Sequence, residues 1–234
     1  MFLSRAYLNP LARAVRADLA DPVGLHRTVM RLFPDGVGAE PRKHLGVLYR
    51  VDADERRGRF VLLVQSKELP DFSRLPSGYL RDLRDDLELA LDGVTDNPSV
   101  RDVSQERKDI QAKQTFVFRL RANTTKKIPK GGKDGGRTKN GQRVPVQGDE
   151  ARILWLKRRE AKGGFAIEAV RVNDVAWASG TRSDSRRVTF AGAQFEGRIA
   201  VTDPDAFRAT LAEGIGPAKA FGFGLLSVTR LPST

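Results

Sequence analysis

Cysteine is absent from the 234-residue chain, and histidine occurs only twice, as His26 and His44. Without cysteine the chain forms no disulfide and offers no thiolate to a metal, which is typical of a protein from a reducing compartment. A structural zinc site takes four nitrogen or sulfur ligands. Two imidazoles cannot supply such a set, so we expect no metal site and no cofactor.

Long apolar runs are missing too. The longest, such as FVLLV at residues 60–64, have the length of a strand, whereas a membrane-spanning helix needs about 20 apolar residues. The opening MFLSRAYLNP has too short an apolar run for a signal peptide. We therefore expect a soluble cytoplasmic protein without a membrane partner, long enough for one large domain or two small ones.

Acidic residues are few relative to basic ones. The chain has 41 lysines and arginines against 29 acidic residues, a net charge of +12. Nine of the basic residues lie between Arg119 and Arg143, where Asp134 is the only acid. Segregated positive charge favours a nucleic acid partner over solubility alone, because phosphates release counterions when a basic protein binds.

Hydrophobic periodicity and turn residues predict two similar halves. In the first, we expect a strand, two helices, two strands and a helix, at residues 2–8, 11–19, 21–33, 45–52, 59–66 and 79–91. In the second, we expect a strand, a helix, strands, a helix and a strand, at residues 114–122, 149–162, 164–172, 188–203, 204–214 and 225–230. Strand 188–203 is expected as two segments.

This order predicts an α+β fold of two tandem ferredoxin-like (RRM-like) domains, each with helices packed on an antiparallel sheet. The expected boundaries are 1–95 for the N-terminal domain, 96–112 for a linker and 113–234 for the C-terminal domain. Residues 124–143, rich in glycine and lysine, are expected as a long mobile loop.

The segment GIGPAKAFGFG at residues 214–224 is rich in glycine. Gly214, Gly216, Gly222 and Gly224 allow backbone N–H groups to approach a phosphate, and Lys219 adds charge. A flexible turn that ends the preceding helix is the alternative. The segment leads from a helix to a strand and has Lys219 in place of the third glycine, so it is not a dinucleotide-binding loop.

His26 lies on the helix that begins with Asp21 and Pro22, next to the apolar stripe that Leu25 and Val29 predict. It is therefore either a structural histidine of the core or a group that exchanges protons near neutral pH.

Arg27 and Arg31 lie one helical turn apart and form a basic pair beside His26. Cleavage of RNA through its own 2′-hydroxyl needs proton transfers and stabilisation of charge on the phosphorus, which an imidazole and arginines can supply. His44 precedes a strand and is expected to be an ordinary surface residue.

Three segments together are similar to a known family: LNPLARAVRADLADPVGLHRTV, FVFRLRAN and FEGRIAVTDPDAFRATLAEGIGPAKAFGFGLLSV, at residues 8–29, 116–123 and 195–228. They resemble CasE, the CRISPR-associated repeat-RNA endoribonucleases of the Cascade complex. The resemblance implies tandem ferredoxin-like domains and cleavage of precursor CRISPR RNA at the base of the repeat stem. It also implies cleavage without a metal, a 2′,3′-cyclic phosphate and retention of the product in Cascade.

The resemblance places the catalytic histidine at His26, and we expect Arg27 and Arg31 to assist it. Some relatives carry a tyrosine one turn before this histidine, where the present chain has Val23. The three tyrosines are expected to lie elsewhere, so no second proton-transfer group is identified.

RNA contacts are expected mostly in the second half, where a basic hairpin, ASGTRSDSRR at residues 178–187, fits the groove at a stem end. Any single residue could equally be a solvated charge. The candidates are Arg13, Arg119, Arg121, Lys126, Lys127, Arg158, Arg159, Arg182, Arg186, Arg187, Gly214, Gly216, Lys219, Gly222 and Gly224.

The main hypothesis is therefore a metal-independent endoribonuclease that binds the CRISPR repeat hairpin and partners other Cascade subunits. A non-cleaving RNA-binding subunit of the same kind of complex is the alternative. An RNA- or ribosome-associated basic protein unrelated to CRISPR has only the charge in its favour.

Overall fold

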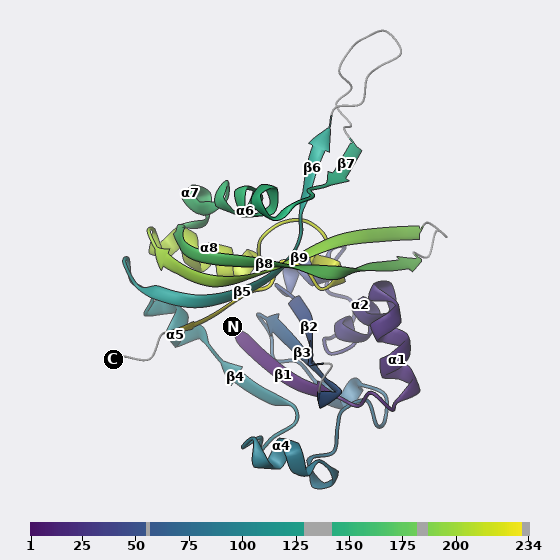
Figure 1. The fold of residues 1–234 in the computed structure, drawn as a ribbon. Helices are drawn as coiled ribbons and strands as arrows, with labels where there is room; N and C mark the ends of the chain where they lie inside the picture. Colours follow the sequence, from purple (N-terminus) through teal and green to yellow (C-terminus); the bar gives the residue numbers. More distant parts are fainter. Residues whose placement is uncertain (55–56, 129–141, 182–186, 231–234) are drawn as a thin grey trace.

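The computed structural model describes residues 1–54, 57–128, 142–181 and 187–230. These residues form two sandwiches of helices on an antiparallel sheet, which Figure 1 shows one above the other. In the described residues, no helix has both the length and the apolar character needed to cross a bilayer.

The N-terminal sandwich has a four-stranded sheet of order β2-β3-β1-β4. Its strands are β1 Phe2–Leu8, β2 Leu48–Asp54, β3 Arg59–Ser66 and β4 Ser99–Asp102. Its helices are α1 Arg13–Ala20, α2 Pro22–Met30, α3 Pro41–His44, α4 Leu87–Leu91 and α5 Ser104–Lys108, with short 3-10 turns η2 Phe72–Arg74 and η3 Leu83–Asp85. The predicted stripe of α2 packs into this core, since Leu25 and Val29 are buried against the sheet.

The C-terminal sandwich has a sheet of order β10-β5-β9-β8. Its strands are β5 Thr115–Asn123, β8 Phe165–Thr181, β9 Arg187–Val201 and β10 Leu226–Arg230. Its helices are α6 Asp149–Lys157, α7 Glu160–Gly163 and α8 Pro204–Glu213, followed by the turn η4 Lys219–Phe221. Alternation decides the faces of β5, where Phe116, Phe118 and Leu120 are buried under the helices.

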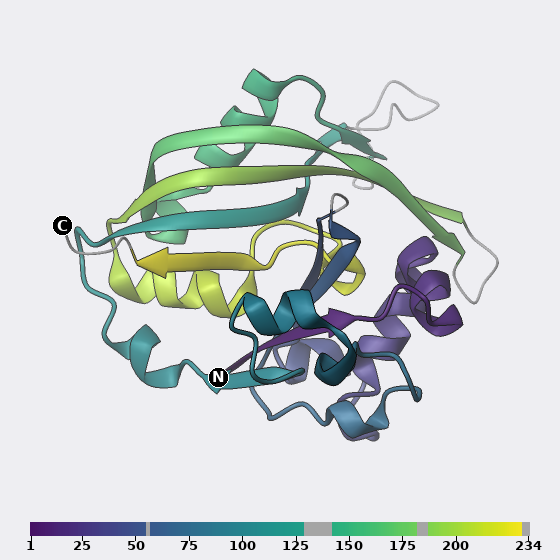
Figure 2. The same ribbon diagram turned by 60° about the horizontal axis from the view of Figure 1, so that its bottom comes forward.

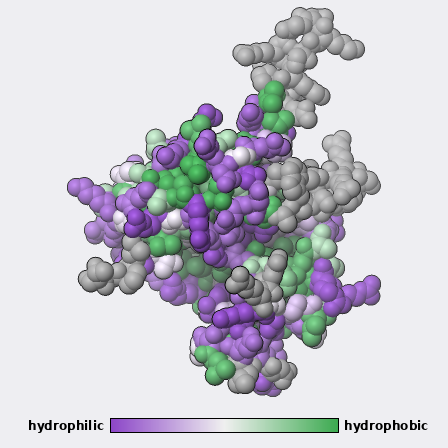
Figure 3. Space-filling model, in the orientation of Figure 1, coloured by the Kyte–Doolittle hydropathy of each residue, from purple (hydrophilic) through white to green (hydrophobic). Residues whose placement is uncertain are grey.

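In each sheet the first and third strands along the chain are central, and the second and fourth strands are at the edges. This is the strand order of a ferredoxin-like fold, so the predicted fold class is confirmed. Hydrophilic residues cover much of the face in Figure 3, with hydrophobic patches between them. Most large apolar side chains lie in the two cores instead.

The expected linker at residues 96–112 is wrong for its middle part. Residues 99–102 form β4, which pairs antiparallel with β1, and α5 follows at once. The strand has four residues, none of them fully buried. Its sequence therefore lacks the alternation that marks longer strands, and the pairing partner is almost 100 residues away.

The helix expected over 79–91 is replaced by two shorter elements, the 3-10 turn η3 and the five-residue helix α4. Asp82 and Asp86 accept hydrogen bonds from the N–H groups of Arg84 and Leu89, so each aspartate starts a new turn. A continuous helix would leave these carboxylates without that role.

Two further segments differ from expectation. Within the predicted loop 124–143, β6 Thr125–Ile128 and β7 Gln142–Pro145 pair as a hairpin that projects from the body in Figure 1; residues 129–141 lie outside the described part. Strand β9 is continuous rather than two segments, because the long β8 pairs with it from Arg187 to Val201 and β5 pairs with residues 192–200.

The distal part of the β8–β9 hairpin reaches the N-terminal sandwich, where β8 lies beside α1 and α2 (Figure 2). The predicted basic hairpin is therefore present as a β-hairpin, although its turn, residues 182–186, lies outside the described residues. The part of β8 that leads into this turn is next to the helix that carries His26.

Candidate active site

Helix α2 brings His26 to the junction of the two sandwiches. The Asp21 side chain accepts hydrogen bonds of 3.0 and 3.1 Å from two backbone N–H groups of the first turn, which fixes the start of the helix. Leu25 and Val29 face the core. His26 is consequently half-buried at the side of the helix and faces the glycine-rich segment 214–224.

Two aromatic rings hold the imidazole. Tyr49 of β2 is stacked with it at a centroid distance of 6.3 Å and an interplanar angle of 11°, and Phe221 of η4 lies at 6.2 Å. Among the described residues, Nδ1 of His26 is buried without a hydrogen-bond partner. The ring is thus placed by packing from both sandwiches.

A pocket of about 210 Å³ opens beside this ring. It is formed by α2, by the segment that contains α3, and by η4. Its lining residues are His26, Met30, Glu40, Pro41, Arg42, Lys43 and Ala220.

Burial lowers the pKa of His26 below its ordinary value near 6.5, and the positive charge of Arg42 lowers it further. At neutral pH the imidazole is therefore neutral and can accept a proton. Arg42 is itself half-buried, and burial lowers its pKa, an effect that Glu40 and Tyr49 oppose.

Tyr49 lies at the site, contrary to the expectation that the tyrosines lie elsewhere. Its hydroxyl donates a 2.7 Å hydrogen bond to the carbonyl of Ala220, and burial raises its pKa strongly. A buried phenol held in this way does not exchange protons at neutral pH. Tyr79 is similar, because burial raises its pKa and its hydroxyl donates to Asp18 at 2.8 Å.

The glycine-rich segment needs its glycines for close packing. Gly214 has φ +75°, and a Cβ there would lie 2.6 Å from the carbonyl oxygen of Gly224. The N–H groups of Gly214 and Gly224 donate to the carbonyls of Thr210 and Arg121, both at 2.8 Å. This corrects the expectation that all four glycines offer N–H groups to phosphate.

The N–H groups of Gly216 and Gly222 have no backbone hydrogen-bond acceptor within the described ranges, so a phosphate contact at these two glycines stays a prediction. Lys219 lies between them, and burial lowers its pKa, with Arg42 contributing in the same direction. Residues 216–222 therefore combine the positive charge of Lys219 with two backbone N–H groups that have no backbone acceptor in the described ranges.

A family model described as "CRISPR associated protein" matches residues 1–230 of the chain. The chain belongs to this family of CRISPR-associated proteins.

Two curated relatives extend over the full length. The CRISPR-associated endoribonuclease Cse3 of Thermus thermophilus is 32% identical over 239 residues, covering 97% of this chain and 99% of the relative. The CRISPR system Cascade subunit CasE of Escherichia coli is 27% identical over 240 residues, covering 99% of this chain and the whole of that protein. Among solved structures, Cse3 bound to a 19-nucleotide RNA has a TM-score of 0.75 at 29% identity, covering 98% of this chain and 100% of that one.

In this CRISPR-associated protein the predicted basic pair of α2 is not part of the pocket lining. Arg27 and Arg31, on α2 and at its C-terminal end, are exposed, and the cations that line the pocket with His26 are Arg42 and Lys43. The role of Arg27 and Arg31 stays a prediction.

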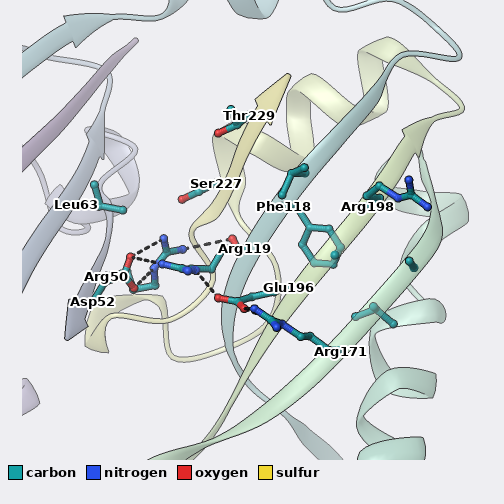
Figure 4. A pocket seen from close by; sticks show the side chains of 14 residues that line it. Arg50, Asp52, Leu63, Phe118, Arg119, Arg171, Glu196, Arg198, Ser227 and Thr229 are labelled. Atoms are coloured by element: carbon teal, nitrogen blue, oxygen red, sulfur yellow. Dashed lines mark hydrogen bonds and ion pairs between the residues drawn. The ribbon is translucent and has the colours of Figure 1, made fainter. Parts of the chain in front are cut away.

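Arg119 and Arg121 share one face of β5, as alternation predicts, but that face is turned to a cleft between the sandwiches. In the cleft, drawn in Figure 4, Arg119 forms ion pairs with Glu196 at 2.6 Å and with Asp52 at 3.4 Å. Arg121 donates to the carbonyl of Val51 at 3.3 Å. These arginines join the two sandwiches, and carboxylates compensate the charge of Arg119, which weakens the case for an RNA contact.

Arg158 and Arg159 lie in a second pocket, of about 430 Å³, which also contains Lys162, Glu213 and Lys219. Burial lowers the pKa of Arg159 to about 10, with a contribution from Arg158. The Arg159 guanidinium lies 3.3 Å from the centroid of the Trp155 ring. Four cations and one carboxylate make this pocket suitable for phosphate.

The remaining candidates are spread over the surface. Lys126 and Lys127 of β6 and Arg13 of α1 are exposed. Arg182 and Arg186 lie outside the described residues, as does the side chain of Arg187. His44 is exposed, as predicted.

Sequence reasoning missed Arg42 and Tyr49. The signal for Arg42 was present in EPRKHLG, where a proline begins a short helix and three basic residues follow it within that helix. Tyr49 gave no comparable signal, because it reads as one position of an apolar strand and its partner Ala220 is 171 residues away.

Proposed function

We propose that this protein is an endoribonuclease that binds the CRISPR repeat hairpin and cleaves precursor CRISPR RNA as a subunit of Cascade. The observation that carries the proposal is the neutral, half-buried imidazole of His26 in a pocket with Arg42, closed by the glycine-rich segment. The names of the two relatives and the RNA bound to Cse3 support it.

The chemistry follows from the groups in the pocket. His26 accepts the proton of a ribose 2′-hydroxyl, the oxygen attacks the adjacent phosphorus, and the bond to the 5′-oxygen breaks. The leaving 5′-oxygen takes up a proton from water and protonated His26 returns its proton to the solvent, so the products are a 2′,3′-cyclic phosphate and a 5′-hydroxyl. Cations at the pocket stabilise the added negative charge during the attack.

We propose further that cleavage needs no metal ion, because His26 and the cations of the pocket supply the groups that the reaction uses. We also propose that the protein acts in the cytoplasm, since it lacks cysteine and its substrate is a transcript. We place the boundary between the two domains after β4 rather than at residue 95, because β4 belongs to the N-terminal sheet. RNA would cross the face formed by α2, the distal β8–β9 hairpin and the pocket that contains Arg158 and Arg159.

The decisive experiment uses a repeat hairpin transcribed from a CRISPR array of the source genome, in two forms. The all-ribose hairpin should be cut in excess EDTA, with a 5′-hydroxyl on the downstream fragment. The same RNA with one 2′-deoxy nucleotide before the cut should bind equally well and resist cleavage. Cutting of the deoxy RNA, or a requirement for added Mg²⁺, would contradict this mechanism.

A non-cleaving RNA-binding subunit remains a second candidate. It is favoured by Val23, a buried aliphatic residue where some relatives have tyrosine, and by the inability of Tyr49 and Tyr79 to exchange protons. Tight binding of the all-ribose hairpin without any cleavage product would decide for this candidate.

A further inference from the structure

We propose that Arg42 binds the scissile phosphate of the RNA and stabilises the charge that develops on it. The inference rests on the proposed function and adds a phosphate-binding group that α2 does not supply. Arg42 lies on α3 and lines the same pocket as His26 of α2.

The backbone holds Arg42 firmly. Its carbonyl accepts a 2.9 Å hydrogen bond from the N–H of Val47, and its Nη1 donates back to the carbonyl of Val47 at 3.0 Å. Leu45 and Val47 are buried, and the carbonyl of Leu45 accepts from Lys67 at 2.8 Å. One bond to the backbone carbonyl of Arg42 and one from its guanidinium, both with Val47, hold the guanidinium just before β2.

The guanidinium has donors to spare. It carries five N–H groups, and the bond to Val47 is the one hydrogen bond its side chain makes within the described part of the chain. Glu40 acts on Arg42 electrostatically, but its carboxylate forms its ion pair with the exposed Lys43, at 3.3 Å. A half-buried arginine that forms no ion pair can satisfy its remaining N–H donors by binding an anion. Its planar guanidinium fits two phosphate oxygens at once.

The surrounding charges also favour an anion. Arg42 acts electrostatically on His26 of α2 and on Lys219 of η4, so it lies within range of both. Three acids act electrostatically on the residues around the pocket. Glu40 acts on Arg42, Asp18 acts on Tyr49 and Glu213 acts on Lys219. The pocket lining itself contains one acid, Glu40, and that acid is engaged by Lys43.

The test compares Arg42→Gln and Arg42→Lys with Arg16→Gln. Arg16 is a matched control, because its Nη1 also donates to a carbonyl five residues away, that of Leu11 at 2.7 Å, but on α1 and outside the pocket. Cleavage is measured under single-turnover conditions with saturating protein. We expect Arg42→Gln to lower the rate constant by about 100-fold, the typical effect of removing one donor to a developing anion, and Arg16→Gln to leave it unchanged.

A binding measurement keeps the test independent of cleavage. The wild-type protein should bind the upstream product with its 2′,3′-cyclic phosphate more tightly than the same RNA with a 3′-hydroxyl. Arg42→Gln should abolish this preference, and Arg42→Lys should retain part of it. Melting curves of all variants show whether loss of the bond to Val47 disturbs folding.

Each failure has a distinct signature. Wild-type protein that binds repeat RNA but never cuts it contradicts the proposed function, while the phosphate preference still tests Arg42. A full cleavage rate in Arg42→Gln, a phosphate preference that persists in this variant, or no preference in the wild type would overturn the role of Arg42.

Discussion

His26 differs from an ordinary core histidine in what surrounds its ring. A structural histidine is held by a hydrogen bond on at least one nitrogen, whereas Nδ1 of His26 is buried and has no partner in the described residues. Tyr49 and Phe221 fix the ring by packing, and Arg42 disfavours its protonation. These features favour a proton acceptor over a structural residue.

We therefore expect His26→Ala to reduce cleavage by about 10²–10⁴-fold, the usual contribution of a general base. Hairpin binding should change only slightly, because the positive surface is spread over many residues. Because burial and Arg42 lower the pKa of His26, the wild-type rate should rise with pH through a midpoint below the ordinary histidine value of 6.5 and then reach a plateau. A rate that first rises well above pH 7, or a variant that has lost its circular dichroism spectrum, would favour the structural role.

At the scale of elements, the site depends on the segment between α8 and β10. Its fold is determined by close backbone approaches at Gly214 and Gly224 and by the hydrogen bond from Tyr49 to Ala220. These contacts place η4 against β2, and thereby close the pocket around His26. A small change in the segment should consequently affect cleavage more than binding.

Gly214→Ala tests this dependence. The new Cβ would lie 2.6 Å from the carbonyl oxygen of Gly224 and 2.8 Å from Leu48 Cδ1, at a φ of +75°. Gly93→Ala is the control, because Gly93 has φ +73° but no atom within 4 Å of a Cβ. We expect the control to lose about 1 kcal/mol of stability from backbone strain alone and to cleave normally. Gly214→Ala should lose more stability and most of its cleavage; equal behaviour of the two variants would contradict the packing argument.

On the scale of the whole molecule, the net charge of +12 is not evenly available. In the cleft of Figure 4, Glu196 and Asp52 balance Arg119, and Glu196 also pairs with Arg171 at 2.6 Å. By contrast, Arg42, Lys219 and Arg159 form no ion pair with a carboxylate within the described residues, and they lie on the face that carries the two smaller pockets. RNA should therefore follow that face and the hairpin that extends toward α2.

Neutralising Arg182, Arg186 and Arg187 together should weaken hairpin binding. The slope of log K against log salt should fall by up to about one for each RNA phosphate that the variant no longer neutralises. The matched control neutralises Arg57, Arg84 and Arg101, which pair with carboxylates around α4, η3 and α5. An unchanged slope in the first variant, combined with a reduced slope after deletion of residues 129–141, would move the RNA contact to the β6–β7 hairpin.

The amino-acid sequence by itself determined most of the elements and their order, because helix starts and strand alternation are local. Asp21-Pro22 and Asp203-Pro204 start α2 and α8 as predicted, since an aspartate cap and a proline act on the same helical turn. Strand β4 and the turns around α4 escaped prediction, because short exposed segments take their form from distant partners and side-chain caps.

The position of His26 on α2 could likewise be predicted, but its surroundings could not. Tyr49 and Arg42 reach the imidazole only when β2 packs against η4, and Arg119 meets its carboxylates only when the two sheets face one cleft. Such contacts join residues from about 16 to 171 positions apart. They depend on how the sandwiches fit together, which no local pattern in the chain encodes, and so the tertiary structure alone decided which groups share the pocket.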